Sequence, residues 1–205
     1  MNGSFMETPV RGVTTLSSEK FPDAWEHWLG VEFLEIVGLH HGDRVLDFGA
    51  GPGHYSLPAA LTVGRRGAVY ALDTNHARLR IIRDKARHRG IRTITPLLVD
   101  GEPPAPLREA SLDVVLAFDV MHLVTDRTQW YREFWRLLHP NGCLTVYPKH
   151  CKDDMPLGGL ADCTIAQVRA EVERCDFRLR SFHRKHLCHD ESQVQGVVLS
   201  FHKGE

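Results

Sequence analysis

The segment "VLDFGAGPGHYS", residues 45–56, constrains the fold of this chain more than any other stretch. An apolar run ends in the acid Asp47, and glycines follow at the alternate positions Gly49, Gly51 and Gly53. Glycine reaches backbone dihedrals that are closed to other residues and lets a ligand approach the main chain closely. The pattern predicts a buried strand, then a tight turn that contacts a ligand, then a helix.

Strand-like and helix-like segments alternate on both sides of this turn. This alternation predicts an α/β fold of the Rossmann-like type, a doubly wound and mostly parallel sheet with helices on both faces. Two strand-like segments close the chain and must be antiparallel, because only the polar stretch "DESQ" joins them. Strands are expected at 43–48, 67–73, 92–100, 111–119, 143–148, 177–188 and 196–202, and helices at 20–38, 53–63, 75–90, 125–138 and 164–175.

The composition points to an ordinary globular domain. The 205 residues are 42% hydrophobic and 25% charged, and the net charge of −1 gives no general attraction to nucleic acid or to anionic membranes. No apolar run is long enough to span a membrane, and the first residues lack the apolar region of a signal peptide. Five scattered cysteines, an odd number, indicate reduced thiols and a cytoplasmic location.

We expect one structural domain preceded by a loose segment. The loose N-terminal segment comprises residues 1–19, and the single domain comprises residues 20–205. Within the domain we expect a helical lid (20–40), a cofactor-binding core (41–148) and an acceptor-side loop, helix and strand pair (149–205).

The acids near the glycine turn select the kind of ligand. A dinucleotide loop has a third glycine where this chain has His54, and Asp47 would repel a pyrophosphate. S-adenosylmethionine has no phosphate and carries positive charge, so it suits this turn. Asp73 ends the second strand, where an acid can hold ribose hydroxyls, and Asp100 ends the third, where a carboxylate can accept from the adenine amine.

Five blocks of sequence make the chain resemble a class I S-adenosylmethionine-dependent methyltransferase, of the small type-11 kind related to ubiquinone/menaquinone C-methyltransferases. The blocks are "VLDFGAGPG", "VYALD", "LLVDGE", "LDVVLAFDVMHLV" and "WRLLHPNGCLTV", in the order and spacing of that family between about residues 30 and 148. The resemblance implies a seven-stranded sheet whose last strand inserts antiparallel beside the sixth.

The resemblance also implies which residues bind the cofactor. The methionine part would contact Asp47 and the backbone of the turn, the ribose would contact Asp73, and the adenine would contact Asp100 and the Gly101 amide. The end of the fourth strand would lie beside the methyl group. The complete set of expected cofactor residues is Asp47, Gly49, Ala50, Gly51, Gly53, Asp73, Asp100, Gly101, Phe118 and Asp119.

His122 is the candidate catalytic residue. It lies three residues after Asp119, and it would act as a general base if the acceptor must lose a proton. The alternative is a loop histidine with a structural role. Trp25 and Trp28 would cover the cofactor as a lid or, alternatively, pack as an ordinary amphipathic helix. The loop after the fifth strand is expected to shape the acceptor pocket, with His150 and Cys151 as its most site-like residues.

The segment "FHRKHLCHD" contains metal-ligand types, but no metal site is expected from it. In a strand, His186 and Cys188 share one face while His183 and His189 share the other, so they cannot close a tetrahedral site without a sharp turn. A solvated basic strand is the simpler interpretation. Methylation of a metalloid such as arsenite stays an alternative, although the cysteines form no CxxC or CC pair.

The leading hypothesis is a methyltransferase that acts on a small-molecule acceptor by in-line displacement. A non-catalytic or partner-dependent binding module is the alternative, and an RNA methyltransferase is a further one. Nucleic-acid substrates are disfavoured because no "PPY"-type motif follows the fourth strand and no Pro-Cys pair is present. An NAD-dependent oxidoreductase is disfavoured by Asp47 and His54. No membrane partner is expected, and the sequence leaves a homodimer and the acceptor's identity open.

Overall fold

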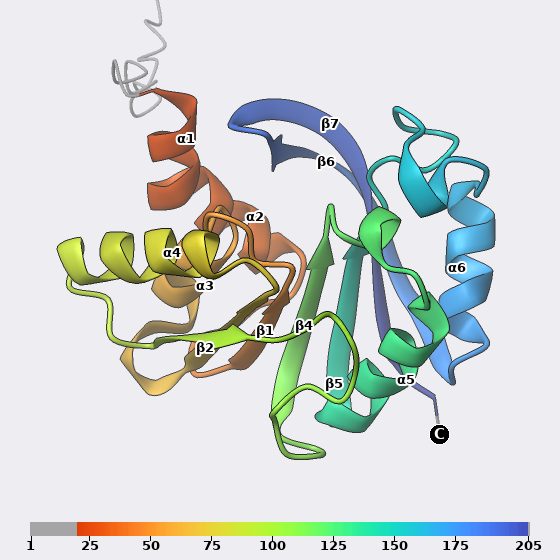
Figure 1. Ribbon diagram of the computed structural model, residues 1–205, viewed down its shortest axis with the longest axis horizontal. Coiled ribbons are helices and arrows are strands. Elements are labelled where there is room, and N and C mark those ends of the chain that lie inside the picture. Colours follow the sequence, from red (N-terminus) through yellow and green to blue (C-terminus); the bar gives the residue numbers. More distant parts are fainter. Residues whose placement is uncertain (1–19, 205) are drawn as a thin grey trace, which may run out of the picture.

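The protein is described from a computed structural model that covers residues 20–204 (Figure 1), so the expectation for residues 1–19 lies outside the described residues. The elements are α1 (Phe21–Ala24), the π-helical turn η1 (Trp25–Leu29), α2 (Gly30–Ile36), β1 (Arg44–Phe48), α3 (Ser56–Val63), η2 (Gly64–Arg66), β2 (Ala68–Asp73), α4 (His76–His88), β3 (Ile94–Leu98), β4 (Leu112–Phe118), η3 (Met121–Leu123), α5 (Arg127–Leu137), β5 (Leu138–Tyr147), η4 (Gly158–Leu160), α6 (Ile165–Glu173), β6 (Phe177–His189) and β7 (Ser192–Lys203).

Seven strands form one sheet in the order β3-β2-β1-β4-β5-β7-β6, as the sequence predicts. The strands β1 to β5 pair in parallel, and β7 pairs antiparallel with both β5 and β6. The chain winds outward from β1 to β3, then returns to β4 and winds outward the other way. The strand order therefore reverses between β1 and β4, which is where ligands bind in open α/β sheets.

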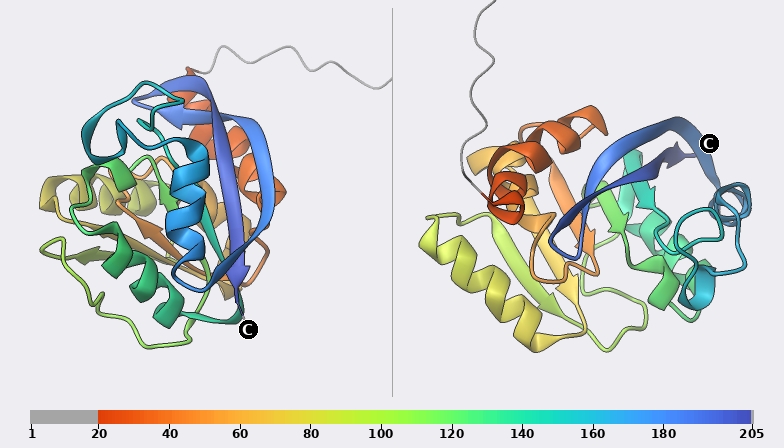
Figure 2. Two further views of the ribbon diagram at one scale, coloured as in Figure 1. Left: turned by 90° about the vertical axis from the view of Figure 1, so that its right-hand side faces the viewer. Right: turned by 90° about the horizontal axis from the view of Figure 1, so that it is seen from above.

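Helices cover both faces of the sheet, as the views in Figure 2 show. Successive strand residues point to opposite faces, so Val45 packs in the core with α2 and α3 while Leu46 packs in the core with α5 and α6. Burial on both faces explains why β1 and β4 are apolar almost throughout. On α4, the predicted apolar face of Leu79, Ile82 and Ala86 is buried.

The caps of two helices lie where the sequence predicts them. Asp126 caps α5 by accepting from the Gln129 backbone amide, and Thr164 forms a capping box with Gln167 at the start of α6. β3, with Pro96 at its centre, forms one edge of the sheet, as expected for a strand that contains proline.

Two strand boundaries differ from expectation. Leu138 already pairs with Leu112, and regular pairing resumes at Cys143 and Val114, so the segment 139–142 is an irregularity inside β5 rather than a turn before it. β7 begins at Ser192 instead of residue 196, because the turn of the hairpin is only two residues long. Asp190 and Glu191 have φ angles of 46° and 64°, the left-handed geometry that tight hairpins require.

The hairpin of β6 and β7 extends beyond the sheet and curves over its carboxyl end towards the N-terminal helices (Figures 1 and 2). β7 pairs with β5 only from Leu199 to His202, whereas it pairs with β6 along its whole length. The tip of the hairpin thereby reaches the edge at which β1 and β4 end. Within residues 20–204, no helix has the length and apolar character needed to cross a bilayer.

Candidate functional site

The turn after β1 depends on glycine at its first position. Gly49 has a φ of 71°, and a Cβ there would lie 2.3 Å from Cγ2 of Val120. The backbone amides of Gly49 and Ala50 both donate to the carbonyl of Leu72, which ties the turn to the end of β2. Gly51 and Gly53 also have positive φ angles. The turn is therefore closely packed against the segment that follows β4, and a larger residue at position 49 would displace it.

Two buried acids lie beneath and beside this turn. Asp73 accepts from the backbone amide of Gly51 at 2.8 Å and from that of Asn75 at 2.7 Å. Asp47 accepts a hydrogen bond from the Ser56 hydroxyl. Burial, together with the charge of Asp73, raises the pKa of Asp47 to about 7, although the Ser56 hydrogen bond acts against this. The two carboxylates thus fix the shape of the turn from below.

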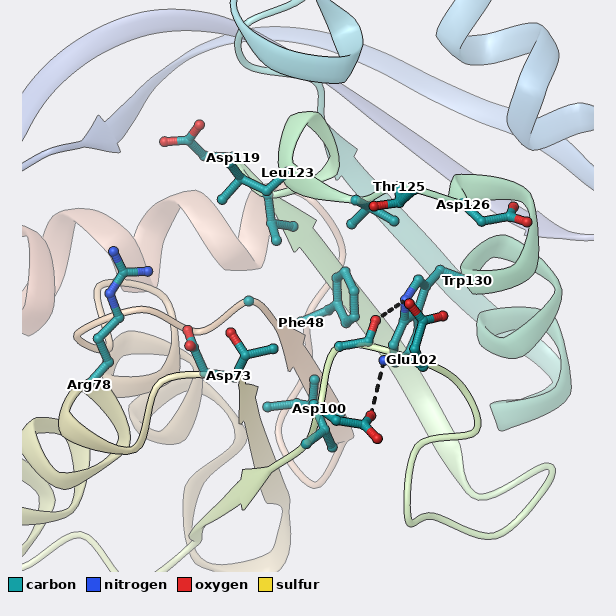
Figure 3. Close-up of a pocket in the computed structure, with 17 residues that line it drawn as sticks. Phe48, Asp73, Arg78, Asp100, Glu102, Asp119, Leu123, Thr125, Asp126 and Trp130 are labelled. Carbon is teal, nitrogen blue, oxygen red and sulfur yellow. Dashed lines mark hydrogen bonds between the residues drawn. The ribbon is translucent and has the colours of Figure 1, made fainter.

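A cavity of about 300 Å³ opens where β1 to β4 end (Figure 3). Asp73 and Asp100 contribute carboxylates to its lining. Phe48 packs against Trp130 with 4.4 Å between their ring centroids, and the Trp130 indole donates to the Gly101 carbonyl at 3.1 Å. We call this the first cavity; it combines acids suited to hydroxyl and amine groups with an aromatic wall.

A second cavity of about 290 Å³ adjoins the first and shares part of its lining. The shared residues are Gly49, Arg78, Asp119 and Leu123. Its other walls come from the glycine turn, from Phe118, from the loop after β5 and from the tip of the β6–β7 hairpin. The two cavities together therefore run from the end of β3 to the hairpin.

Three histidines surround Asp119 in the second cavity, and we call these four residues the histidine cluster. One Asp119 carboxylate oxygen, Oδ1, lies 3.8 Å from Nδ1 of His122 and 3.7 Å from Nε2 of His150. The other, Oδ2, accepts a hydrogen bond from Nδ1 of His189. The imidazole rings of His122 and His150 meet edge to face at 4.4 Å between centroids.

The local backbone directs these side chains inward. Asp119 and His150 have φ angles of 53° and 66°, a region that residues other than glycine seldom occupy. Gly158 lets the loop after β5 pack on the backbone of His122, because a Cβ at this position would lie 2.6 Å from the His122 carbonyl oxygen. Strained residues of this kind persist only where the surrounding structure fixes them, and they are concentrated at functional sites.

The cluster contains polar atoms without hydrogen bonds. Among residues 20–204, Asp119 Oδ1 and His122 Nδ1 are buried and have no hydrogen-bond partner. Burial has the largest effect on the pKa of His122 and lowers it. The Asp119 carboxylate raises this pKa and the imidazoles of His150 and His189 lower it, so that it is lowered overall. The lowered pKa favours the neutral form of the His122 imidazole.

The N-terminal helical segment is fixed to the glycine turn and to α4. Trp25 is 1% exposed and donates its indole N–H to the His54 carbonyl at 2.8 Å. Glu26 pairs with Lys85 and Arg89. Burial raises the pKa of Glu26, but the His54 and Lys85 hydrogen bonds and the charges of Lys85 and Arg89 outweigh it, so the pKa falls to about 2.

Comparisons with known proteins give the family. Residues 46–146 match the family described as "Methyltransferase domain". The chain is 30% identical over 113 residues to the ubiquinone/menaquinone biosynthesis C-methyltransferase UbiE of Vibrio vulnificus strain YJ016, covering 55% of this chain and 44% of the relative.

It is 37% identical over 97 residues to the aklanonic acid methyltransferase DauC of Streptomyces sp. strain C5, covering 43% of each. The crystal structure of a SAM-dependent methyltransferase from Aquifex aeolicus has the same fold, with a TM-score of 0.71 and 21% identity over 87% of this chain and 93% of that one.

The chain belongs to the class I S-adenosylmethionine-dependent methyltransferases.

S-adenosylmethionine is the methyl donor of this family. The chain spans less than half the length of the curated relatives that it matches, and the family match covers residues 46–146. The comparisons therefore establish the family and the donor, and they leave the acceptor unidentified.

Most of the predicted cofactor residues of this methyltransferase line the two cavities. Gly49, Asp73, Asp100, Gly101 and Asp119 line the first cavity. The second is lined by Gly49, Asp119, Ala50, Gly51 and Phe118. Asp47 and Gly53 line neither cavity, so their contact with the cofactor stays a prediction.

The acceptor-side predictions have mixed outcomes. His122 and His150 lie together in the second cavity. Cys151 points away from them; it is fully buried in the core shared with α5 and α6, because the left-handed backbone at His150 turns the chain there. Trp25 packs in the core, which matches the amphipathic-helix alternative, and Trp28 is 43% exposed.

Sequence reasoning missed two kinds of contact. Trp130 was assigned only to the buried stripe of a helix, although it also forms a wall of the first cavity. His189 was considered only with its neighbours in the strand, whereas the hairpin brings it to Asp119, 70 positions earlier in the chain. No pattern within a few residues can signal a contact between residues so far apart in the chain. The predicted antiparallel strand pair was the one feature of the sequence related to this contact.

Proposed function

We propose that this protein transfers the methyl group of S-adenosylmethionine to a small-molecule acceptor that binds in the second cavity. The observation that carries the proposal is the meeting of the two cavities at Gly49 and Asp119, beside the glycine turn. An adenosine group suits the first cavity, and a cavity of about 290 Å³ beside it suits a small acceptor rather than a polymer.

The residues of the first cavity fit the cofactor on chemical grounds. The Asp73 carboxylate is buried and fixed by two backbone amides, yet each oxygen keeps a lone pair that can accept from a ribose hydroxyl. Asp100 can accept from the adenine amine, and Phe48 and Trp130 provide an apolar wall for the ring. The acids Asp73 and Asp47, which bond to the Gly51 amide and to the Ser56 hydroxyl, would disfavour a pyrophosphate at the glycine turn.

Bound S-adenosylmethionine supplies a methyl group activated by its sulfonium: the carbon–sulfur bond breaks with its electron pair left on sulfur as the acceptor's lone pair forms the new bond to carbon. The contribution of the protein is to align the two groups and to exclude water, and alignment alone can lower the barrier by roughly 7–11 kcal/mol. The packing of Gly49 against Val120 gives this alignment a rigid base.

His122 is placed to act on the acceptor rather than on the cofactor. It lines the second cavity and not the first, and its neutral imidazole has a free lone pair that can take up the proton of a hydroxyl, thiol or amine. A general base of this kind contributes about 10²- to 10⁴-fold to a rate.

Calorimetric titration with S-adenosylhomocysteine tests the cofactor half of the proposal, with NAD as the control ligand. We expect micromolar binding of S-adenosylhomocysteine alone. Asp73→Ala should weaken it by at least tenfold, and Asp73→Asn, which keeps one accepting oxygen, should weaken it less. Asp84→Ala is the matched control, because Asp84 is exposed on α4. Failure of the folded protein to bind would contradict the proposal.

The acceptor half is tested by following S-adenosylhomocysteine production from S-adenosylmethionine across a panel of small hydroxyl, thiol, amine and carbon-acid compounds. Turnover with one class identifies the acceptor atom. Tight cofactor binding without turnover across the panel would favour the binding-module alternative, in which the domain acts through a partner.

A further inference from the structure

We propose that Asp119, His122 and His150 bind one divalent transition-metal cation, and that His189 positions the Asp119 carboxylate for it. The metal site is argued from the histidine cluster alone. Only the link to the acceptor, given below, rests on the proposed function.

The geometry of the three groups suits a single cation. One ligand atom from each residue lies within 4.8 Å of the others. Asp119 Oδ1 is 3.8 Å from His122 Nδ1 and 3.7 Å from His150 Nε2. These separations are too long for hydrogen bonds, but a tetrahedral ion with ligands at 2.0–2.1 Å needs neighbouring ligand atoms about 3.4 Å apart. Two of the three separations are thus within about 0.5 Å of this value, and the third is no longer than 4.8 Å, so small movements of the side chains would close the site.

A hydrogen bond to the backbone fixes the tautomer of His150. Its Nδ1 lies 2.8 Å from the Met155 carbonyl, an acceptor only, so Nδ1 carries the proton and donates it. The lone pair is thereby left on Nε2, the atom that faces Asp119 Oδ1. A hydrogen bond from the far nitrogen of a ligating histidine to a carbonyl or carboxylate is the usual support of a metal ligand.

His189 gives the same support to the carboxylate. It donates from Nδ1 to Asp119 Oδ2, so Oδ2 is occupied and Oδ1 is left for another partner. His122 completes the set: its side chain is only 8% exposed, and Nδ1 has no hydrogen-bond partner in the part of the chain that the structure describes. Three possible ligand atoms therefore lie close together, and on Asp119 and His150 the other polar atom of the side chain is held by a hydrogen bond.

This convergence is costly without a cation. A buried polar atom left without a hydrogen bond costs about 1–3 kcal/mol, and both Asp119 Oδ1 and His122 Nδ1 are in this state. The positive φ angles at Asp119 and His150 add backbone strain. A cation would satisfy the free lone pairs of all three residues at once, which explains why such an arrangement is maintained in a cavity.

The ligand types indicate which metals fit. Two imidazole nitrogens and one carboxylate oxygen favour Zn²⁺, Fe²⁺, Co²⁺ or Ni²⁺ over the oxygen-preferring Mg²⁺ and Ca²⁺. Cys188 also lines the second cavity, but its sulfur does not belong to the group of atoms that could share one ion. We therefore expect no thiolate ligand.

Three protein ligands leave at least one coordination position for the acceptor. Given the proposed function, the acceptor is then a small molecule that presents an oxygen or sulfur donor to the metal. The metal would lower the pKa of that donor group, and its proton would leave to solvent. With Nδ1 bound to the metal, His122 would act on the acceptor through the metal, and the general-base role given above belongs to the metal-free protein.

Direct metal titration tests the site. Protein treated with a chelator and then freed of it is titrated with Co²⁺, followed by visible absorption, and with Zn²⁺, followed by calorimetry. We expect one equivalent to bind, without the intense near-ultraviolet band of a cobalt–thiolate bond, and no binding of Mg²⁺ at the same concentration. His150→Ala and Asp119→Asn should each weaken Zn²⁺ binding by at least a hundredfold, and His189→Ala by about 10- to 100-fold.

His183→Ala is the matched control, since His183 lies on the same strand as His189 but outside the cluster. It should leave Zn²⁺ binding unchanged. Near-ultraviolet circular dichroism and a cooperative urea transition show that each variant is folded, since Asp119 is itself a predicted cofactor residue. Absence of metal uptake by folded wild-type protein, or uptake that His150→Ala leaves intact, would overturn the metal site. Metal binding without any binding of S-adenosylhomocysteine would instead contradict the proposed function and leave the metal site standing.

Discussion

The two cavities differ in how their polar groups are satisfied. Beside the first cavity, Asp73 is held by two backbone amides and Asp47 by a serine hydroxyl, all within one short stretch of chain. In the second, the histidine cluster joins residues up to 70 positions apart and leaves two buried atoms without hydrogen bonds. The two acids beside the first cavity thus have partners within the chain, whereas the histidine cluster contains buried polar atoms without one in the part of the chain that the structure describes.

This difference follows from the fold. Parallel strands end at the same edge of the sheet, so the acids that follow β1, β2 and β3 are neighbours by necessity. The second cavity is assembled from a loop and from the tip of an antiparallel hairpin. The fold itself therefore places the residues of the cofactor side, whereas the residues of the acceptor side depend on loops that can vary.

The largest expected effect is a loss of catalytic rate without a loss of cofactor affinity, which would separate the acceptor side from the cofactor side. His122→Ala should lower kcat by about 10²- to 10⁴-fold, because it removes a group that acts on the acceptor. The affinity for S-adenosylhomocysteine, measured by calorimetry, should change less than twofold. His186→Ala, at an exposed position on β6, is the control and should leave both unchanged. Equal losses of rate and affinity in His122→Ala would contradict the division between the cavities.

The next effect concerns pH and the cofactor side. Because the pKa of Asp47 is raised from 3.8 to about 7 in the folded protein, its contribution to stability is fully present below pH 4 and is lost as the pH rises through 7. Asp47→Asn has no titrating group at this position, so its stability does not fall in this way as the pH rises. Relative to the variant, the wild type should therefore lose about 3–4 kcal/mol between pH 4 and pH 8, as measured by urea unfolding. A pH-independent difference would show that Asp47 titrates normally.

A smaller effect is expected from the packing of the glycine turn. Gly49→Ala forces a side chain into Val120 at a positive φ, and it should cost about 2–4 kcal/mol of stability and at least tenfold in S-adenosylhomocysteine affinity. Gly90→Ala is the matched control: its φ is 66°, but a Cβ there meets nothing within 4 Å, so only about 1 kcal/mol should be lost. Similar costs at both positions would show that contact with Val120 is unimportant.

The smallest effect tests the N-terminal segment. Trp28 is 43% exposed, so Trp28→Ala should change the free energy of unfolding by about 0.5 kcal/mol or less and leave the cofactor affinity unchanged. Trp25→Ala, which empties a core position, should cost about 3–5 kcal/mol. A clear loss of S-adenosylhomocysteine affinity in Trp28→Ala alone would support the predicted lid over simple helix packing.

The sequence predicts the cofactor side well because its signals are local. Glycines at alternate positions, an acid at the end of each strand and helical periodicity each act within a few residues, so they predict the alternating strands and helices and the cavity shared by Asp73, Asp100 and Gly101. The start of β7 is not predicted correctly. It depends on a two-residue turn at Asp190 and Glu191, whose positive φ angles are possible for these residue types but are not required by them.

The histidine cluster was predicted only in fragments. His122 was recognised from its distance to Asp119, and His150 from its place in a loop, but neither position reveals which way the imidazole points. The left-handed backbone at His150 decides that, and it sends the adjacent Cys151 into the core. His189 depends on the length and curvature of the hairpin, which are set by packing across the whole sheet.

The β6–β7 hairpin has a mechanical consequence. From Leu199, where its pairing with β5 ends, to its turn at Ser192, the hairpin is a lever arm about 20 Å long. A rotation of about 5° at its base moves the tip by about 2 Å, enough to separate His189 from Asp119 while every β6–β7 hydrogen bond stays intact. The tip is tied down beside the glycine turn, where the Tyr55 hydroxyl donates to the Cys188 carbonyl. Leu187, Cys188 and Val198 of the hairpin are also buried in the core that contains Trp25 and Tyr55, so a movement of the tip would have to break these contacts, although no strand would have to unpair.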